Sequence, residues 1–160
     1  MFKLQLARHN DIETLVNSSL YDQNSFYPAF LKDLGQCQSE VIIECPFITL
    51  KRITALLPTF RELRRRGACI VVNTKDPIEH DEYFQAQAGI AIALLQSIGV
   101  RVLYTGNHHR KLAIIDRSIL YEGSLNILSQ NDSAEIMRRL VSKELVEETI
   151  RLIGLYRFLN

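Results

Sequence analysis

Residues 109–126 read HRKLAIIDRSILYEGSLN and carry the most informative pattern of the sequence. Two short apolar runs flank the polar residues 116–118. Apolar runs on either side of a short polar turn are typical of a β-hairpin. We therefore predict two neighbouring strands that turn at residues 116–118.

Two pairs of polar residues stand at the open end of this hairpin. His109 and Lys111 are two residues apart, and so are Ser124 and Asn126. Because alternate side chains of a strand share one face, the members of each pair point the same way if both segments are extended. The hairpin would then gather an imidazole, a cation, a hydroxyl and an amide. That inventory suits a phosphate, because lysine supplies charge while serine and asparagine donate hydrogen bonds.

The sequence upstream of the hairpin alternates between predicted strands and helices. Apolar, β-branched runs at 41–44, 68–73 and 100–104 are typical of buried strands. Apolar residues at helical spacing predict helices at 51–66 and 76–97. This order predicts an α/β fold, a central mixed and mainly parallel sheet with helices on both faces.

Four further elements are predicted, amphipathic helices at 11–20, 26–34 and 143–158 and a strand at 135–141.

The chain has 160 residues, of which 47% are hydrophobic, enough for the core of one domain. We predict a single domain over residues 1–160, with residues 1–23 as a candidate N-terminal extension.

Composition excludes several classes of protein. The formal net charge of +1 produces no global field that would draw the chain to nucleic acid or to a membrane. The three cysteines are too few for a disulfide scaffold and form no CxxC pair. The longest apolar stretch, 89–95, is too short to span a bilayer, and residues 1–11 lack the apolar core of a signal peptide. We expect a soluble, cytoplasmic protein with reduced thiols and no membrane partner.

The pattern of the hairpin resembles a known family signature. His109-x-Lys111-x4-Asp116-x6-Gly123-Ser124-x-Asn126 has every fixed position of the HKD motif of the phospholipase D superfamily, at the family's spacing. Glu135 stands where the family often has a glutamate. The resemblance implies a phospholipase D-like sandwich, and the strand and helix order upstream agrees with it.

The resemblance also implies roles for individual residues. His109 would be the nucleophile that forms a covalent phosphohistidine, while Lys111, Ser124 and Asn126 would bind the phosphate oxygens. Glu135 would orient the imidazole of His109.

Asp116 belongs to the same motif, but two roles stay open for it. It either joins the catalytic set or caps backbone amides at the hairpin turn. Arg138 is a candidate for binding substrate phosphates, although paired arginines are often only surface residues.

The family mechanism needs two histidines, one to attack phosphorus and one to protonate the leaving oxygen. This chain holds one copy of the motif, since His9 and His80 are each followed at the second position by an acid. The resemblance therefore implies a homodimer with its active site at the two-fold interface, and it implies no metal or cofactor.

Single-motif chains of this superfamily resemble nucleases more than lipid hydrolases, so the expected activity is that of a phosphodiesterase and endonuclease acting on DNA. A weaker likeness, carried by FYPAFLKDL at 26–34, VIIECPFIT at 41–49 and IVVNT at 70–74, is to phospholipase D-type domains attached to bacterial helicases or ATPases. The chain can therefore be one domain of such a protein. Two alternatives stay open: a phospholipid or small-diester hydrolase or transferase, and a non-catalytic DNA-binding or dimerisation module.

Three other groups of residues have both a functional and a structural interpretation. The basic residues between 51 and 75 could meet a phosphate backbone or form a solvated helix face. The acids between 76 and 82 could hold a metal ion or begin a helix. The aromatic residues Tyr21, Phe26, Tyr27 and Phe30 could stack on bases or form core. In each case the structural interpretation is favoured.

Overall fold

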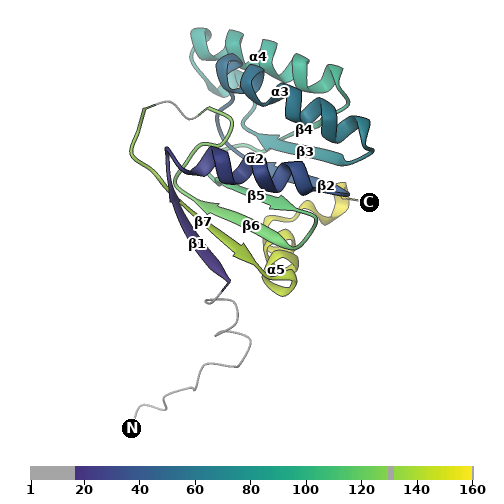
Figure 1. Cartoon of the computed structure of the whole chain (residues 1–160). Helices are drawn as coiled ribbons and strands as arrows, with labels where there is room; N and C mark the ends of the chain where they lie inside the picture. Colours follow the sequence, from purple (N-terminus) through teal and green to yellow (C-terminus); the bar gives the residue numbers. More distant parts are fainter. Residues whose placement is uncertain (1–16, 130–131, 160) are drawn as a thin grey trace.

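A mixed sheet forms the centre of the fold. The computed structural model describes residues 17–129 and 132–159, and within them seven strands form one sheet in the order β1-β7-β6-β5-β2-β3-β4 (Figure 1). The strands are β1 (Ser18–Asp22), β2 (Glu40–Glu44), β3 (Cys69–Thr74), β4 (Arg101–Tyr104), β5 (Leu112–Ile115), β6 (Ile119–Gly123) and β7 (Ile136–Val141).

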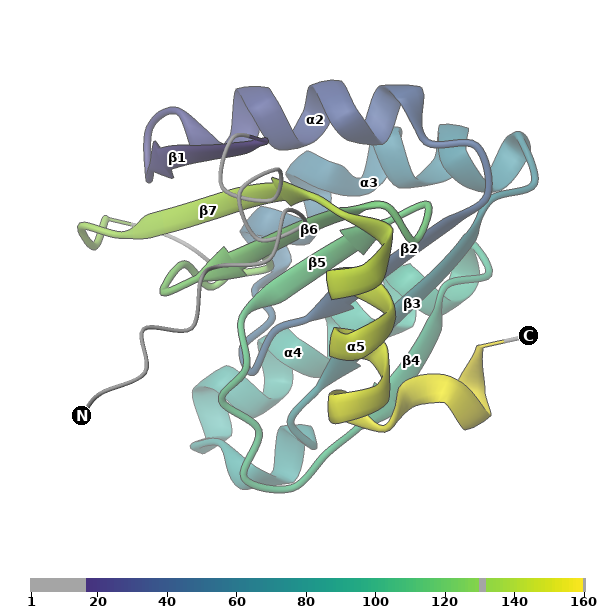
Figure 2. The same ribbon diagram turned by 90° about the horizontal axis from the view of Figure 1, so that it is seen from below.

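Helices cover both faces of the sheet, as the sequence predicts. The helices are α2 (Phe26–Gln36), α3 (Leu50–Arg65), α4 (Glu82–Ser97) and α5 (Lys143–Ile153), with short 3-10 helices η1 (Pro77–Glu79) and η2 (Leu155–Phe158). Helices α2, α3 and α4 lie on one side, and α5 crosses the other side (Figure 2). None of these helices is long and apolar enough to cross a membrane.

The predicted direction of the strands is only partly correct. Strand β3 pairs in parallel with β2 and β4, but the other four pairings in the described sheet are antiparallel. The parallel half is the half built with intervening helices. The chain from β5 to β7 has no such crossover, and strands joined without one pair antiparallel. The sheet is therefore mixed and mainly antiparallel.

Two segments differ from their sequence prediction. Residues 18–22 form the edge strand β1, paired with β7, and are neither a helix nor part of an extension; residues 11–16 of that predicted helix lie outside the described residues. The helix predicted at 76–97 is divided. Asp76 caps the turn η1 through the N–H of Ile78, and Asp81 caps α4 through the N–H of Phe84.

Two apolar layers hold the helices against the sheet. Val41, Ile43 and Ala113 face α2, α3 and α4, whereas Ile42 and Ile114 face α5. This follows from the alternation of side chains along a strand. It also explains why the run at 41–44 is apolar at every central position, since both faces of β2 are covered.

The aromatic residues of α2 belong to the core. Phe26 and Phe30 are fully buried, and their rings stack at 5.2 Å. Each also meets the ring of Tyr121 edge-on. A base cannot reach them, so the structural interpretation of this group is correct for Phe26 and Phe30.

The hairpin turn is held by the carboxylate of Asp116. Residue 116 has a φ of 50°, in the left-handed region that aspartate tolerates better than most residues. Its oxygens accept hydrogen bonds from the backbone N–H groups of Gln38, Ser39 and Glu40, at 2.8, 2.8 and 3.0 Å. Although burial raises its pKa, these bonds outweigh that effect and lower the pKa to about 2. Asp116 thus ties the β5–β6 turn to the start of β2.

The variant Asp116→Asn should unfold more readily, with a free energy of unfolding about 1–3 kcal/mol lower at neutral pH, because its amide is a weaker acceptor than the carboxylate. Folding lowers this pKa from an ordinary 3.8 to about 2. The difference between wild type and variant should therefore be complete above about pH 4 and shrink as the pH falls toward 2. Urea denaturation across this range measures it. The exposed Asp132, changed in the same way, is the control and should shift stability by no more than about 0.5 kcal/mol.

Candidate functional site

The predicted phosphate-binding residues collect at one edge of the sheet. His109 and Lys111 immediately precede β5, Ser124 and Asn126 follow β6, and Glu135 immediately precedes β7. Because β5 and β7 run antiparallel to β6, and β5 runs antiparallel to β2, all five positions lie at the edge where β2 and β3 end. Residues far apart in sequence are thereby brought to one place.

Backbone hydrogen bonds hold the three segments of this edge together. The N–H of Gly123 donates to the carbonyl of Lys111 at 3.2 Å, and the N–H of Ser124 donates to the carbonyl of Ile136 at 3.0 Å. The hydroxyl of Ser124 in turn accepts from the N–H of Ile136. A Cβ on Gly123 would stand 2.1 Å from the Ile136 carbonyl oxygen, so this close approach of β6 to β7 requires glycine.

The polar side chains at this edge range from exposed to partly buried. His109 is exposed, and the ammonium of Lys111 donates to the backbone carbonyl of His109 at 3.0 Å. Both residues lie outside the regular strand, since β5 begins at Leu112. The Oδ1 atom of Asn126 is buried and has no partner among the described residues. A buried polar atom without a partner is uncommon in folded proteins, and a bound group is one explanation for it.

His109, Lys111, Ser124 and Asn126 are called the cluster below. Glu135 is close to the cluster but does not form a hydrogen bond with His109 within the described chain. Its carboxylate accepts from the hydroxyl of Ser133 at 2.7 Å, and its N–H donates to the side chain of Gln23. That Glu135 orients the imidazole of His109 therefore stays a prediction.

Arg138 faces a neighbouring groove. It is exposed on β7 and lines a hollow of about 480 Å³ together with Arg110, Lys111 and Glu122. Its neighbour Arg139 has a different environment, because it forms an ion pair with Asp33 at 2.6 Å. Only the first of the two arginines is thus placed beside the cluster.

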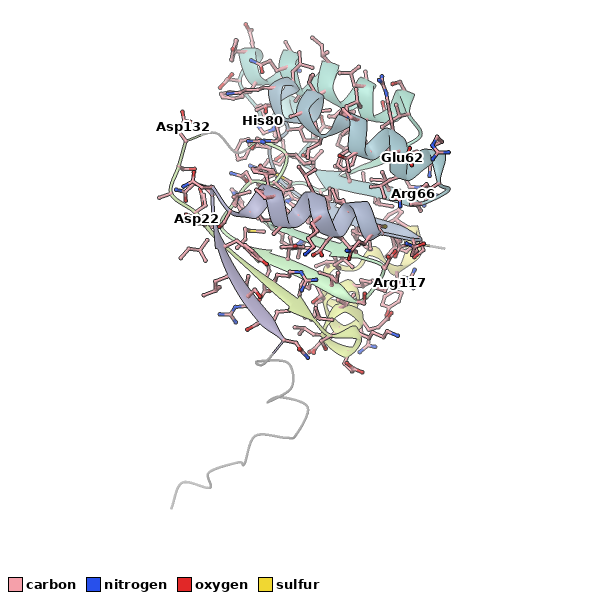
Figure 3. All side chains as sticks on the ribbon, viewed as in Figure 1. Asp22, Glu62, Arg66, His80, Arg117 and Asp132 are labelled. Carbon is pink, nitrogen blue, oxygen red and sulfur yellow. The ribbon has the colours of Figure 1, made fainter. Side chains whose placement is uncertain are left out.

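Asp116 lies away from this edge. The four residues of β5 lie between it and Lys111, so the two positions are five steps apart, which at about 3.3 Å per residue is roughly 16 Å. Figure 3 shows Arg117, the next residue in the turn, at the opposite end of the molecule from His80 and Asp132. Of the two roles left open for Asp116, the observed contacts are those of the backbone cap.

A buried carboxylate that the motif does not include organises the edge. Glu44, the last residue of β2, is fully buried. Its oxygens accept from Nδ2 of Asn73 at 2.8 Å and from Nε of Arg110 at 2.5 Å. The ring nitrogen Nε2 of His108 lies 2.8 Å from the same carboxylate, a close contact without the alignment of a good hydrogen bond. Glu44 thus holds both chain neighbours of His109.

The environment of Glu44 favours its charged form. Burial alone raises the pKa of the carboxyl, but the contacts with His108, Arg110 and Asn73 outweigh it, and the pKa lies below its ordinary value. Sequence reasoning misses this residue, because the apolar run at 41–44 predicts a buried strand and gives no role to the charge of Glu44. The signal was present: an acid that ends an otherwise apolar strand needs a buried partner.

The variant Glu44→Gln should lower the free energy of unfolding by about 3 kcal/mol, because it removes the charge that compensates its buried neighbours. Amide exchange in residues 105–111 should also accelerate. Since folding lowers the pKa of Glu44, the stabilisation should be present above its ordinary value of 4.5 and be lost as the pH falls below it.

The variant Glu122→Gln is the matched control for Glu44→Gln, because Glu122 is exposed on the same face of the sheet. The same denaturation and amide-exchange experiments are applied to both variants. Equal behaviour of the two variants would contradict the organising role of Glu44.

Cys45 adjoins the cluster but is not suited to act as a nucleophile. Its thiol is buried, contacts the carbonyl of Phe47, and burial raises its pKa to about 11. The nearby charge of Lys111 offsets only part of this shift. The thiol therefore stays protonated at neutral pH.

The acids between 76 and 82 form no metal site in the structure. No group of three or more metal-ligating side chains occurs within residues 17–129 and 132–159. Asp76 and Asp81 cap their helices, and Glu79 accepts from the N–H of Asn107 at 3.3 Å. The structural interpretation of this group is therefore supported.

The arginines at the end of α3 serve the fold. Arg64 and Arg66 donate to backbone carbonyls of Ala68 and Gly35, and Arg65 pairs with Glu62 at 2.8 Å. Figure 3 shows Glu62 and Arg66 at the end of the molecule opposite His80. This part of the basic run does not face the cluster.

Comparison with known proteins gives one family and several similar structures. A family model described as "Cardiolipin synthase, PLD-like domain" matches residues 30–153. No curated protein sequence matches the chain. Nuc, a phospholipase D family member from Salmonella typhimurium, superposes with a TM-score of 0.66 at 14% identity, over 84% of this chain and 90% of that one.

Two further structures share the fold. NucT from Helicobacter pylori has a TM-score of 0.68 at 18% identity, over 84% of this chain and 91% of that one. A polyphosphate kinase from Porphyromonas gingivalis has a TM-score of 0.69 at 12% identity, over 89% of this chain but only 26% of that one. At these identities the likeness concerns the fold.

Proposed function

The chain belongs to the phospholipase D superfamily, and we propose that it is a phosphodiesterase that cleaves DNA without a metal ion, through a covalent phosphohistidine on His109. One observation carries the proposal: the hairpin and β7 bring His109, Lys111 and the Ser124–Asn126 segment to a single edge of the sheet. These groups supply a nucleophile, a cation and hydrogen-bond donors for one phosphate.

The reaction proceeds in two displacements. A ring nitrogen of His109 attacks phosphorus, and the bond from phosphorus to the leaving oxygen breaks as a second histidine gives that oxygen a proton. Water, losing a proton to the second histidine, then attacks phosphorus and frees His109. Lys111 stabilises the charge on the non-bridging oxygens, and the side-chain N–H of Asn126 donates to one of them.

The second histidine comes from another copy of the chain. Among the described histidines, His108 is buried beside Glu44, and His80 does not begin a second motif, because Glu82 stands where the motif has its lysine. A two-fold dimer that places two His109 side chains together supplies the missing group. The exposure of His109 at an edge of the sheet is compatible with this arrangement.

Incubation with DNA in excess EDTA tests the activity and its independence of metal. Wild type should cleave, and His109→Ala or Lys111→Ala should reduce the rate by at least about 10³-fold, because each removes a group that acts on the reacting phosphate. Lys143→Ala, an exposed lysine on α5, is the matched control and should cleave like wild type. Cleavage that persists in the His109 variant would exclude the phosphohistidine.

Mixed dimers test the shared active site. If both copies of His109 are needed, co-refolding equal amounts of wild type and His109→Ala should leave about one quarter of the wild-type activity, since only dimers with two intact chains work. About one half would remain if each chain acts alone. Sedimentation of the wild type should give twice the mass of one chain, and a monomeric active species would refute the dimer.

A phospholipid substrate is the second candidate, because the matching family model is described as that of a cardiolipin synthase. The same assay with phospholipid vesicles in place of DNA separates the two. Turnover of lipid with no cleavage of DNA would replace the nuclease assignment while leaving the roles of His109 and Lys111 intact.

A further inference from the structure

A second hollow, separate from the groove beside Arg138, opens between α3 and α4. It has a volume of about 520 Å³, and its lining comprises Phe47, Thr49, Lys51, Tyr83, Phe84, Gln87 and Ser129. We propose that this hollow binds an unstacked base of single-stranded nucleic acid, next to the phosphate held by the motif. The inference rests on the proposed function and narrows its substrate to a single strand.

The aromatic side chains of the hollow are unusually exposed. Tyr83 is 70% exposed and Phe84 44% exposed. Their rings meet edge-on at 5.7 Å, so each leaves a face open. The backbone of Phe84 is held at the start of α4, because its N–H donates to the capping carboxylate of Asp81 at 3.0 Å. Exposed aromatic rings are the groups on which single-stranded binders stack bases.

Positive charge accompanies these rings. Lys51 lines the hollow, and the ammonium of Lys75 lies 5.5 Å from the centre of the Phe47 ring. Stacking platforms for single strands combine such cations, which follow the backbone, with aromatic faces, which meet the bases. The volume also falls within the roughly 300–1,000 Å³ of small-molecule sites, so it accommodates a nucleoside.

The hollow adjoins the candidate phosphate site through the chain itself. The N–H of Ser129, a lining residue, donates to the carbonyl of Asn126 at 3.0 Å. The N–H of Thr49, also in the lining, donates to the carbonyl of Leu128 at 3.0 Å. The turn that carries Asn126 is thus fastened to the start of α3. A strand with one phosphate at Asn126 would have a neighbouring base within reach of the hollow.

A base of a duplex is not free to enter this hollow. The bases of a duplex are stacked and paired, and extruding one of them costs a few kcal/mol. A single strand presents its bases without that cost. The aromatic lining therefore favours a single strand, whereas phosphate contacts alone would not distinguish the two.

Binding to two oligomers tests the inference. A fluorescent oligothymidylate and an abasic oligomer of equal length are titrated in EDTA against the full chain carrying His109→Asn, which prevents cleavage. Tyr83→Ala and Phe84→Ala should each raise the Kd for the oligothymidylate at least about fivefold, the effect of one lost stacking contact. The Kd for the abasic oligomer should change by less than about twofold, and Tyr83→Phe should restore binding.

The control is Tyr156→Ala, a tyrosine 41% exposed on η2, which should change neither Kd. Equal weakening for both oligomers, or no weakening, would overturn the inference. Variants that dissociate a wild-type dimer would overturn it as well, since a second copy would then cover the hollow.

Base-dependent binding without cleavage by wild type would refute the proposed function alone, and cleavage without base dependence would refute the base site alone.

Discussion

The charge of Glu44 is the constraint on which the candidate site depends. A carboxylate that is fully buried costs several kcal/mol unless it is paired and hydrogen-bonded, and the partners it finds determine the path of the neighbouring chain. Asn73 fastens it to β3, and Arg110 and His108 fasten it to the segment that leads into β5. Because those two residues flank His109, the satisfied charge of Glu44 fixes where the exposed imidazole stands.

The same logic applies at the other end of β2. The pairing of β2 with β5 is the junction between the parallel and antiparallel halves of the described sheet. Each end of this junction carries an acid on β2 and an arginine beside β5, Glu44 with Arg110 and Glu40 with Arg117. Asp116 adds three backbone bonds at the second end. The halves are therefore locked in register from both sides, and a slip by one residue would exchange the faces of β5.

The sequence predicts what depends on local spacing and fails where the outcome depends on distant pairing. The hairpin, the strands at 41–44, 68–73 and 100–104 and the helices on both faces are confirmed. Residues 18–22 are polar and weakly patterned, so their role as an edge strand comes from the bonds that β7 offers and not from their own pattern. The roles of Glu44 and Tyr83 cannot be predicted for a related reason. The partners of Glu44 and the exposure of Tyr83 both depend on segments that are remote in sequence.

The structure also accounts for the spacing of the motif. The four residues between Lys111 and Asp116 are those of β5, and the six between Asp116 and Gly123 are the rest of the turn and most of β6. The fixed positions therefore divide into two kinds. Asp116 and Gly123 set the turn and the close approach to β7, while the other four positions place polar side chains at the open end. The spacing of the motif corresponds to the length of one hairpin, and that length determines whether the two polar pairs lie close together. An added residue in either strand would exchange the faces of the strand residues beyond it or break their pairing, so the hairpin that carries both polar pairs tolerates no change of length.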